Sequence, residues 1–115
     1  MKAAFKQGTH VTLREVTLPP LAPDQIRVKV AACGICGTDL HVNPAEADTE
    51  HPFGHEMAGT VIEKGCGVTN LEVGQPVVIE SATPCGFCAN CKNARQELCT
   101  AIQSFFFLGH FGFAE

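Results

Sequence analysis

The chain has 115 residues, 45% of them hydrophobic, which is enough for one packed domain but not for two. Its formal net charge of −4 argues against nucleic acid or an anionic membrane surface as the main partner. No apolar run approaches the roughly 18 residues that a membrane span needs, and the N-terminus becomes polar too early for a secretion signal. We therefore expect a cytoplasmic protein with neither nucleic acid nor membrane as partner.

The N-terminal segment predicts a hairpin followed by a break. Residues 3–6 and 11–17 predict two short strands around a Gly8-Thr9 turn. The proline-rich stretch 18–23 that follows cannot join the centre of a sheet, because proline lacks the donor that a ladder needs.

The clearest strand pattern covers residues 25–32, where apolar and charged side chains alternate. One face of this strand is expected to point to the core with Ile26, Val28, Val30 and Ala32, and the other face to carry Arg27 and Lys29. Cys33 to Gly37 predicts a turn. Thr38-Asp39 is expected to cap a short helix that ends at His41.

The rest of the chain predicts more short strands and one cysteine-rich loop. Residues 43–54 are expected to be loop, and residues 57–63 and 77–79 to be strands. The stretch 83–99 predicts an irregular loop with a helical turn near 93–97. Many short strands separated by glycine and proline are typical of a mainly β domain built as a small, partly open barrel.

Seven cysteines in a chain without a secretion signal favour metal binding over disulfides. Four of them have the spacing C-x2-C-x2-C-x7-C, at Cys85, Cys88, Cys91 and Cys99. Gly86, inside the first gap, can take the positive φ that such a turn often needs. Four thiolates close a tetrahedral shell and leave no place for substrate, so this pattern predicts a structural zinc site.

Two other interpretations of the four cysteines stay open at this point. The C-x2-C-x2-C run also begins the ferredoxin iron–sulfur pattern, although that pattern usually continues with a proline after the fourth cysteine, where this chain has Thr100. The four residues could also be unligated thiols in a loop. The spacing favours zinc over both.

A second, partial metal shell is possible around Cys36 and His55. Cys33 and Cys36 form a C-x-x-C pair, but Cys33 ends the predicted core strand and could simply be buried. His55 opens the next strand about twenty residues later. One thiolate and one imidazole leave positions for a water or a substrate oxygen, as Lewis-acid chemistry requires. From spacing alone, an unrelated cysteine and histidine is the more common explanation of such a pattern.

Two stretches resemble the signatures of zinc-containing medium-chain alcohol dehydrogenases. They are CGICGTDLH at residues 33–41 and GHEMAGTVIEKGCGV at residues 54–68, and the second fits the pattern G-H-E-x2-G-x5-G-x2-V throughout. The cysteine loop, about 83–100, resembles the structural-zinc lobe of the same family. The resemblance covers nearly the whole chain and implies a GroES-like N-terminal catalytic domain over residues 1–115. Polyol and threonine dehydrogenases are the nearest in appearance.

The resemblance implies that Cys36 and His55 are ligands of a catalytic zinc, with Glu56 as a carboxylate that can approach the metal. Neighbouring residues of a regular strand point to opposite faces, so His55 and Glu56 can reach one ion only if the backbone is irregular there. Up to two zinc ions per chain are implied, one at this site and one in the lobe.

The same resemblance assigns roles in proton transfer around the metal. Thr38 would hydrogen-bond the oxygen of a small-molecule alcohol, His41 would pass the proton onward, and Asp39 would orient the zinc-binding imidazole. Helix capping by Thr38 and Asp39, and a surface position for His41, are the simpler alternatives without the resemblance.

A dinucleotide-binding fingerprint is not expected within these residues. The nearest string, residues 65–70, lacks the third glycine of G-x-G-x-x-G and precedes no helical pattern. NAD(P), the third protein ligand of the catalytic zinc and oligomer formation are therefore expected only of a longer enzyme with a Rossmann domain, and the 115 residues alone are expected to be inactive. The alternatives are a stand-alone zinc-binding structural or interaction module and, by fold analogy alone, a co-chaperonin-like protein.

Overall fold

The computed structural model describes residues 1–41, 48–104 and 112–115. In chain order its elements are β1 (Lys2–Gln7), β2 (His10–Glu15), β3 (Ile26–Gly34), α1 (Gly37–Leu40), β4 (His51–Pro52), β5 (Glu56–Lys64), β6 (Pro76–Ile79), β7 (Ala82–Thr83), α2 (Ala89–Lys92), the 3₁₀ turn η1 (Gln96–Leu98) and β8 (Gln103–Ser104). The strands form sheets in the orders β2-β1-β4, β3-β5-β6 and β7-β8. The expected mainly β, partly open fold is confirmed.

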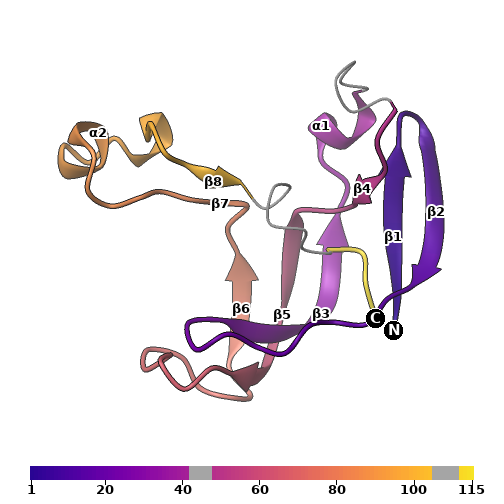
Figure 1. The fold of residues 1–115 in the computed structure, drawn as a ribbon, viewed down its shortest axis with the longest axis horizontal. Coiled ribbons are helices and arrows are strands. Elements are labelled where there is room, and N and C mark those ends of the chain that lie inside the picture. The colour runs from indigo at the N-terminus through magenta and orange to yellow at the C-terminus, as the bar shows by residue number, and fades with distance from the viewer. Residues whose placement is uncertain (42–47, 105–111) are drawn as a thin grey trace.

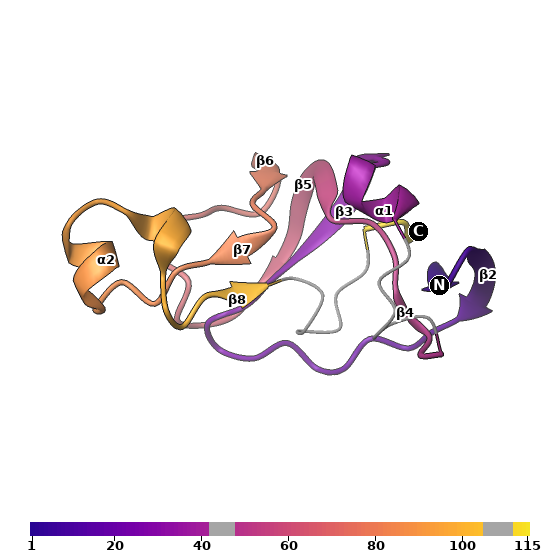
Figure 2. The ribbon, with the colours of Figure 1, turned by 90° about the horizontal axis from the view of Figure 1, so that it is seen from above.

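Figure 1 shows the three sheets arranged in a row across the molecule. The β1–β2 hairpin lies at one end, β3, β5 and β6 form the middle, and the segment from β7 to β8 extends away from them as a separate lobe. The view from above gives the same order, with α2 at the far tip of the lobe (Figure 2). Among the described residues, no helix is long and apolar enough to cross a membrane.

The β1–β2 hairpin has the predicted two-residue turn. Gln7 pairs with His10, and Gly8 between them has a φ of 57°, which glycine adopts without strain. On the other side, β1 pairs with β4 in the register Phe5↔Pro52 and Lys6↔His51. The β4 strand lies within the stretch that the sequence predicted as loop, because two residues give no alternation to detect.

Strand β3 departs from the predicted alternation at its end. Val28 and Val30 pair with Val61 and Gly59 and are half-buried, as predicted. A register shift between Val30 and Ala32 then inserts one extra residue, so that Ala32 is exposed. The expected core position of Ala32 is therefore wrong, and Cys33 takes the inward place instead.

The helical segments also begin at other residues than predicted. Cys36, not Thr38, is the N-cap of α1, and Asp39 sits inside the helix at its third position. In the lobe, α2 precedes the stretch near 93–97 where a single turn was predicted, and η1 overlaps the last two residues of that stretch. Both differences shift short elements by a few residues and leave the order of elements unchanged.

The hydrophobic core is small for a chain of this mass. Its buried members in the two main sheets are Ala3, Ala4, Met57 and Val61. The accessible surface is 7726 Å², whereas a compact monomer of 12.2 kDa would expose about 6,100 Å². Part of the excess lies on the open face of the β3-β5-β6 sheet, where Ile62 is 48% and Val78 is 84% exposed.

Candidate metal centres

The four cysteines of the predicted structural site lie together in the lobe. All seven cysteines of the chain are unbridged, and the potential ligand atoms of Cys85, Cys88, Cys91 and Cys99 lie within 4.8 Å of one another. The sulfur–sulfur distance is 3.5 Å between Cys88 and Cys91 and 3.9 Å between Cys85 and Cys91. Four sulfurs at 2.3 Å from a tetrahedral zinc would be about 3.8 Å apart. The donor set therefore fits zinc in both chemistry and spacing.

Backbone N–H groups point at the sulfurs of the lobe. Cys85 N–H donates to Cys99 Sγ at 3.3 Å, Cys88 N–H to Cys85 Sγ at 3.4 Å, and Ala101 N–H to Cys99 Sγ at 3.4 Å. Such donors stabilise thiolate and also orient it for a metal. Similar donation from the N–H of Cys91 lowers the pKa of Cys88 to about 6.

Cys91, one of the two buried cysteines of the set, behaves in the opposite way. Desolvation raises the pKa of Cys91 to about 12, and its side-chain hydrogen bond with Cys88, which favours the protonated Cys91 thiol, adds to this increase. The pKa of Cys99 is lowered, chiefly by the N–H of Cys85. Without a cation the lobe thus favours some thiolates and opposes another, and a bound metal ion would favour all four because its charge stabilises every thiolate.

The helix that carries Cys91 ends in a Schellman motif. Arg95 N–H donates to Asn90 O at 2.9 Å and Ala94 N–H to Cys91 O at 3.2 Å. The residue in the left-handed position is Ala94, with a φ of 56°, where glycine is usual. The Asn90 side chain closes the lobe further by donating to Leu98 O at 2.5 Å.

The lobe has almost no apolar interior. Its buried residues among those described are two of the four clustered cysteines, Cys91 and Cys99, each 8% exposed. Phe87 is 71% and Leu98 is 54% exposed. The positive φ expected for Gly86 is confirmed at 78°. Apolar burial therefore contributes little to the stability of the lobe.

The second group of possible ligands consists of Cys36, His55 and Glu56. One ligand atom from each lies within 4.8 Å of the others. Cys36 stands at the N-cap of α1, and Glu56 is the first residue of β5. Gly54, with a φ of 89°, directly precedes His55 and turns the chain before β5 begins. His55 thus lies outside the regular strand, and this irregularity lets adjacent side chains approach one point.

The glycines of the second signature stretch are required by close approaches. A Cβ on Gly54 would lie 2.5 Å from Phe113 Cδ2 and 2.8 Å from Cys33 Sγ. A Cβ on Gly59 would meet the carbonyl of Lys29 on the adjacent strand, and one on Gly65 would meet the backbone of Ala22 and Pro23. These glycines hold β5 against its neighbours and so fix where His55 and Glu56 lie.

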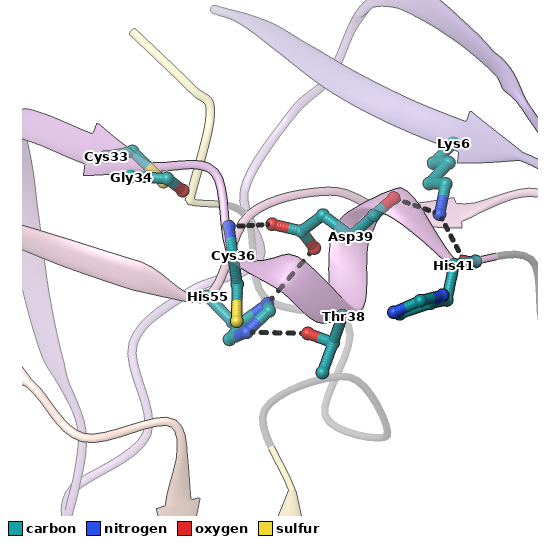
Figure 3. Close-up of polar contacts among 8 residues, drawn as sticks. All are labelled: Lys6, Cys33, Gly34, Cys36, Thr38, Asp39, His41 and His55. Carbon is teal, nitrogen blue, oxygen red and sulfur yellow. Dashed lines mark hydrogen bonds and ion pairs between the residues drawn. The ribbon is translucent and has the colours of Figure 1, made fainter.

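The Asp39 carboxylate contacts two of the three possible ligand residues, Cys36 and His55 (Figure 3). Its Oδ2 accepts the Cys36 N–H at 2.8 Å, and its Oδ1 lies 3.3 Å from His55 Nδ1. Asp39 is 6% and His55 is 7% exposed, so both polar groups depend on such partners. The other ring nitrogen of His55, Nε2, lies 3.3 Å from the Thr38 hydroxyl.

Two candidate residues lie at the edges of this arrangement. The His41 ring lies beyond Thr38 from His55 in the view of Figure 3. Cys33 is half-buried against Gly54 and Gly112, and burial raises the pKa of its thiol. The C-x-x-C pair therefore does not act as a unit, since Cys36 joins the second ligand group and Cys33 faces the core side.

Lys6 is a residue of the site that the sequence did not indicate. Its Nζ donates to Asp39 O at 2.5 Å and to His41 O at 3.1 Å, across from β1 to α1 (Figure 3). By strand alternation Lys6 shares a face with the buried Ala4. Ala3, on the opposite face, is also buried, so alternation alone marks neither face of β1 as inward, and Lys6 becomes informative only when the carbonyls opposite it are known.

A pocket of about 480 Å³ opens beside this second ligand group. His55 and Glu56 line one side, and Ala58 and Val78 of the open sheet face line another. The pocket therefore combines two candidate ligands with an apolar wall.

The alcohol dehydrogenase GroES-like domain family matches residues 22–115. The chain therefore belongs to this family, the zinc-dependent medium-chain alcohol dehydrogenases. The L-threonine 3-dehydrogenase of Thermococcus kodakarensis is 39% identical over 106 residues, covering 87% of this chain and 30% of that protein.

Solved structures agree with this assignment. Galactitol-1-phosphate dehydrogenase from Escherichia coli superposes with a TM-score of 0.85 at 29% identity, over 100% of this chain and 34% of that one. A protein described as a zinc-binding dehydrogenase from Sinorhizobium meliloti, bound to NADP, gives 0.77 at 32% identity, over 91% and 32% of the two chains. The present chain spans about a third of the length of each of these relatives.

Proposed function

We propose that residues 1–115 form the zinc-binding catalytic domain of an NAD(P)-dependent oxidoreductase that acts on the CH–OH group of a small alcohol or polyol. The observation that carries this proposal is the convergence of Cys36, His55 and Glu56, with Asp39 bound to two of them. The relatives support the substrate class, since they include a threonine and a galactitol-1-phosphate dehydrogenase.

The two ligand groups are suited to different tasks. Cys36 and His55 offer a thiolate and an imidazole, donors that zinc accepts, and the Glu56 carboxylate can approach the same point. With one more protein ligand, such a shell leaves a position for substrate. The lobe offers four thiolates, which close the shell. When bound at the Cys36–His55–Glu56 group, zinc would supply the Lewis acidity that lowers the pKa of an alcohol, and the nicotinamide would supply the hydride acceptor.

The residues around the ligands would handle the proton. The Thr38 hydroxyl lies 3.3 Å from His55 Nε2, close enough to the ligand group to accept the proton of a substrate hydroxyl. His41, on the next turn of the chain, would pass that proton to solvent. Asp39 would keep the proton of His55 on Nδ1, which leaves the Nε2 lone pair for the metal.

The cofactor would be held by a further domain of the same enzyme. The open face of the β3-β5-β6 sheet and the adjoining pocket lie on one side of the ligand group, where such a domain could cover them. The third protein ligand of the catalytic zinc would come from the same direction, and the complete enzyme would be an oligomer in the cytosol. The 115 residues alone are expected to give no NAD(P)-dependent alcohol oxidation.

Metal content of the purified chain tests the proposal. With zinc in excess we expect two ions per chain, the second held more weakly than the lobe ion. His55→Ala should remove the weaker ion only, whereas His10→Ala, at an exposed position on β2, should leave both. A single ion that depends on the lobe cysteines and is insensitive to His55→Ala would contradict a catalytic site and favour a stand-alone zinc module.

A further inference from the structure

The helix that carries Asp39 is too short to hold its own position. The helix α1 is a single turn, Gly37–Leu40, and helices of this length are unstable in water without tertiary support. It has an acidic residue in its first turn but no basic residue in its last turn. Its C-terminal carbonyls therefore need a cationic partner from elsewhere in the fold.

Lys6 supplies that partner. Its ammonium group donates to Asp39 O at 2.5 Å and to His41 O at 3.1 Å, so it joins the last helical turn to the residue that ends it. An ammonium on these carbonyls combines charge-assisted hydrogen bonding with a favourable interaction with the helix dipole. The contact fixes the backbone of the same residue whose carboxylate holds Cys36 N–H and His55 Nδ1.

The strand that carries Lys6 also holds the segment that leads to His55. The backbone of Lys6 pairs with His51 on β4, and Phe53 N–H donates to Ala4 O at 3.0 Å. The two segments that bring metal ligands together, one through α1 and one through β4, therefore meet on β1. Lys6 lies at this junction, with its backbone on one segment and its side chain on the other.

We infer that Lys6 is a positioning residue for the Cys36–His55–Glu56 site, acting through Asp39 from outside the ligand group. This inference rests on the proposed function, because it concerns the metal site proposed there. It assigns Lys6 no contact with metal, substrate or cofactor. The predicted consequence is that loss of the ammonium disorders α1 and releases the His55 ring from Asp39, while the lobe is unaffected.

The first test needs no metal. In the ¹⁵N-labelled, metal-free chain, the imidazole nitrogens of His55 should report a single tautomer with the proton on Nδ1. In Lys6→Met the two nitrogen shifts should move toward each other as tautomers mix, and Lys6→Arg should restore the wild-type shifts. Lys2→Met is the matched control, because Lys2 lies on the same strand and face and is exposed. Wild-type imidazole shifts in Lys6→Met would overturn the inference.

The second test separates this inference from the proposed function. Co²⁺ is titrated into each variant, with the lobe cysteines as internal reference. We expect Lys6→Met to weaken cobalt binding at the Cys36–His55 site about tenfold and to leave cobalt binding by the lobe unchanged. Tenfold is the lower end of the affinity loss seen when residues that support metal ligands are replaced. Equal affinities in Lys6→Met and Lys2→Met would overturn the role of Lys6. Failure of the wild-type chain to bind cobalt at Cys36 and His55 would overturn the proposed function, and the imidazole shifts would still decide on Lys6.

Discussion

The two ligand groups of this domain are assembled in opposite ways. The lobe takes its four cysteines from one continuous stretch, residues 85–99, and has almost no other interior. The Cys36–His55–Glu56 group takes its ligands from two segments that only the folded sheets bring together. The first group is set by local chain geometry with little apolar support, and the second is set by the packing of sheets that are distant in the sequence.

The largest expected effect is on the lobe. Cys91→Ser should abolish lobe zinc binding, because a hydroxyl replaces a buried thiolate in a site without an apolar core. The apparent binding free energy lost is on the order of 10 kcal/mol. Zinc content and thermal unfolding measure this, with Cys66→Ser, exposed and outside both groups, as the control. Retention of the lobe ion in Cys91→Ser would show that the four cysteines are not its ligands.

Gly54→Ala should damage the second group and spare the lobe. The alanine would be strained by the left-handed backbone, and its Cβ would overlap Phe113 and Cys33. Together these effects should lower the free energy of unfolding by about 3–5 kcal/mol. Gly74→Ala separates the two effects, because Gly74 has a φ of 92° with open space around its Cβ position. In a denaturant titration, the free energy of unfolding of Gly74→Ala should fall by only about 1–2 kcal/mol. Equal losses at the two positions would argue against the crowding described at Gly54.

Asp39→Asn should weaken the second site without unfolding it. The amide keeps the shape of the carboxylate but loses the charge that orients His55. We expect metal affinity to fall about 10- to 100-fold, or about 1.4–2.8 kcal/mol, by competition with a chelator. Asp24→Asn, at an exposed position, should bind metal as the wild type does.

The pKa shifts predict which lobe thiol reacts first in the metal-free chain. With the pKa of Cys88 at about 6, against an ordinary 9.0, this thiol is about 90% ionised at pH 7, and alkylation should be about fivefold faster than for an ordinary thiol after allowing for its lower nucleophilicity. Its rate should fall by half near pH 6. Because the folded pKa is lowered, its contribution to metal-free stability is complete above pH 9 and is lost as the pH falls through about 6.

Mass spectrometry of labelled peptides at several pH values measures this order, with Cys66 as the exposed reference thiol and saturating zinc as the protected state. Cys91, with its raised pKa, should be the slowest to react. Faster labelling of Cys91 than of Cys88 would contradict the hydrogen-bond arrangement of the lobe.

The smallest expected effect is a gain. Ala94→Gly should stabilise the lobe by about 0.5–1 kcal/mol, because glycine removes the strain of a left-handed alanine but loses more entropy on folding. Ala89→Gly, at the start of the same helix, should instead destabilise the lobe by about 0.5–1 kcal/mol. Zinc retention against a chelator would rank the wild type and the two variants. A change in lobe stability of the same sign in both variants would exclude the Schellman explanation.

The difference between the ligand groups also explains what the sequence could predict. Cysteine spacing is local, so the four lobe cysteines and the positive φ of Gly86 could be predicted from the chain alone. The alternation of residues 25–32 predicted β3, but not the register shift that exposes Ala32, because a bulge depends on the partner strand. The convergence of Cys36 and His55 required the family signatures, and Lys6 required the fold itself, since no local pattern marks a contact 33 residues distant.

The two ends of the described chain lie side by side, as Figure 1 shows. Ala3 forms a bridge with Ala114, Glu115 N–H donates to Lys2 O at 3.0 Å, and Ala4 N–H donates to Phe113 O at 2.8 Å. A few linker residues could therefore join the ends, and new ends could be opened at an exposed turn such as Gly8-Thr9. The same geometry would allow the whole domain to be inserted into a surface loop of a host protein, where metal binding in the domain would be reported by the host.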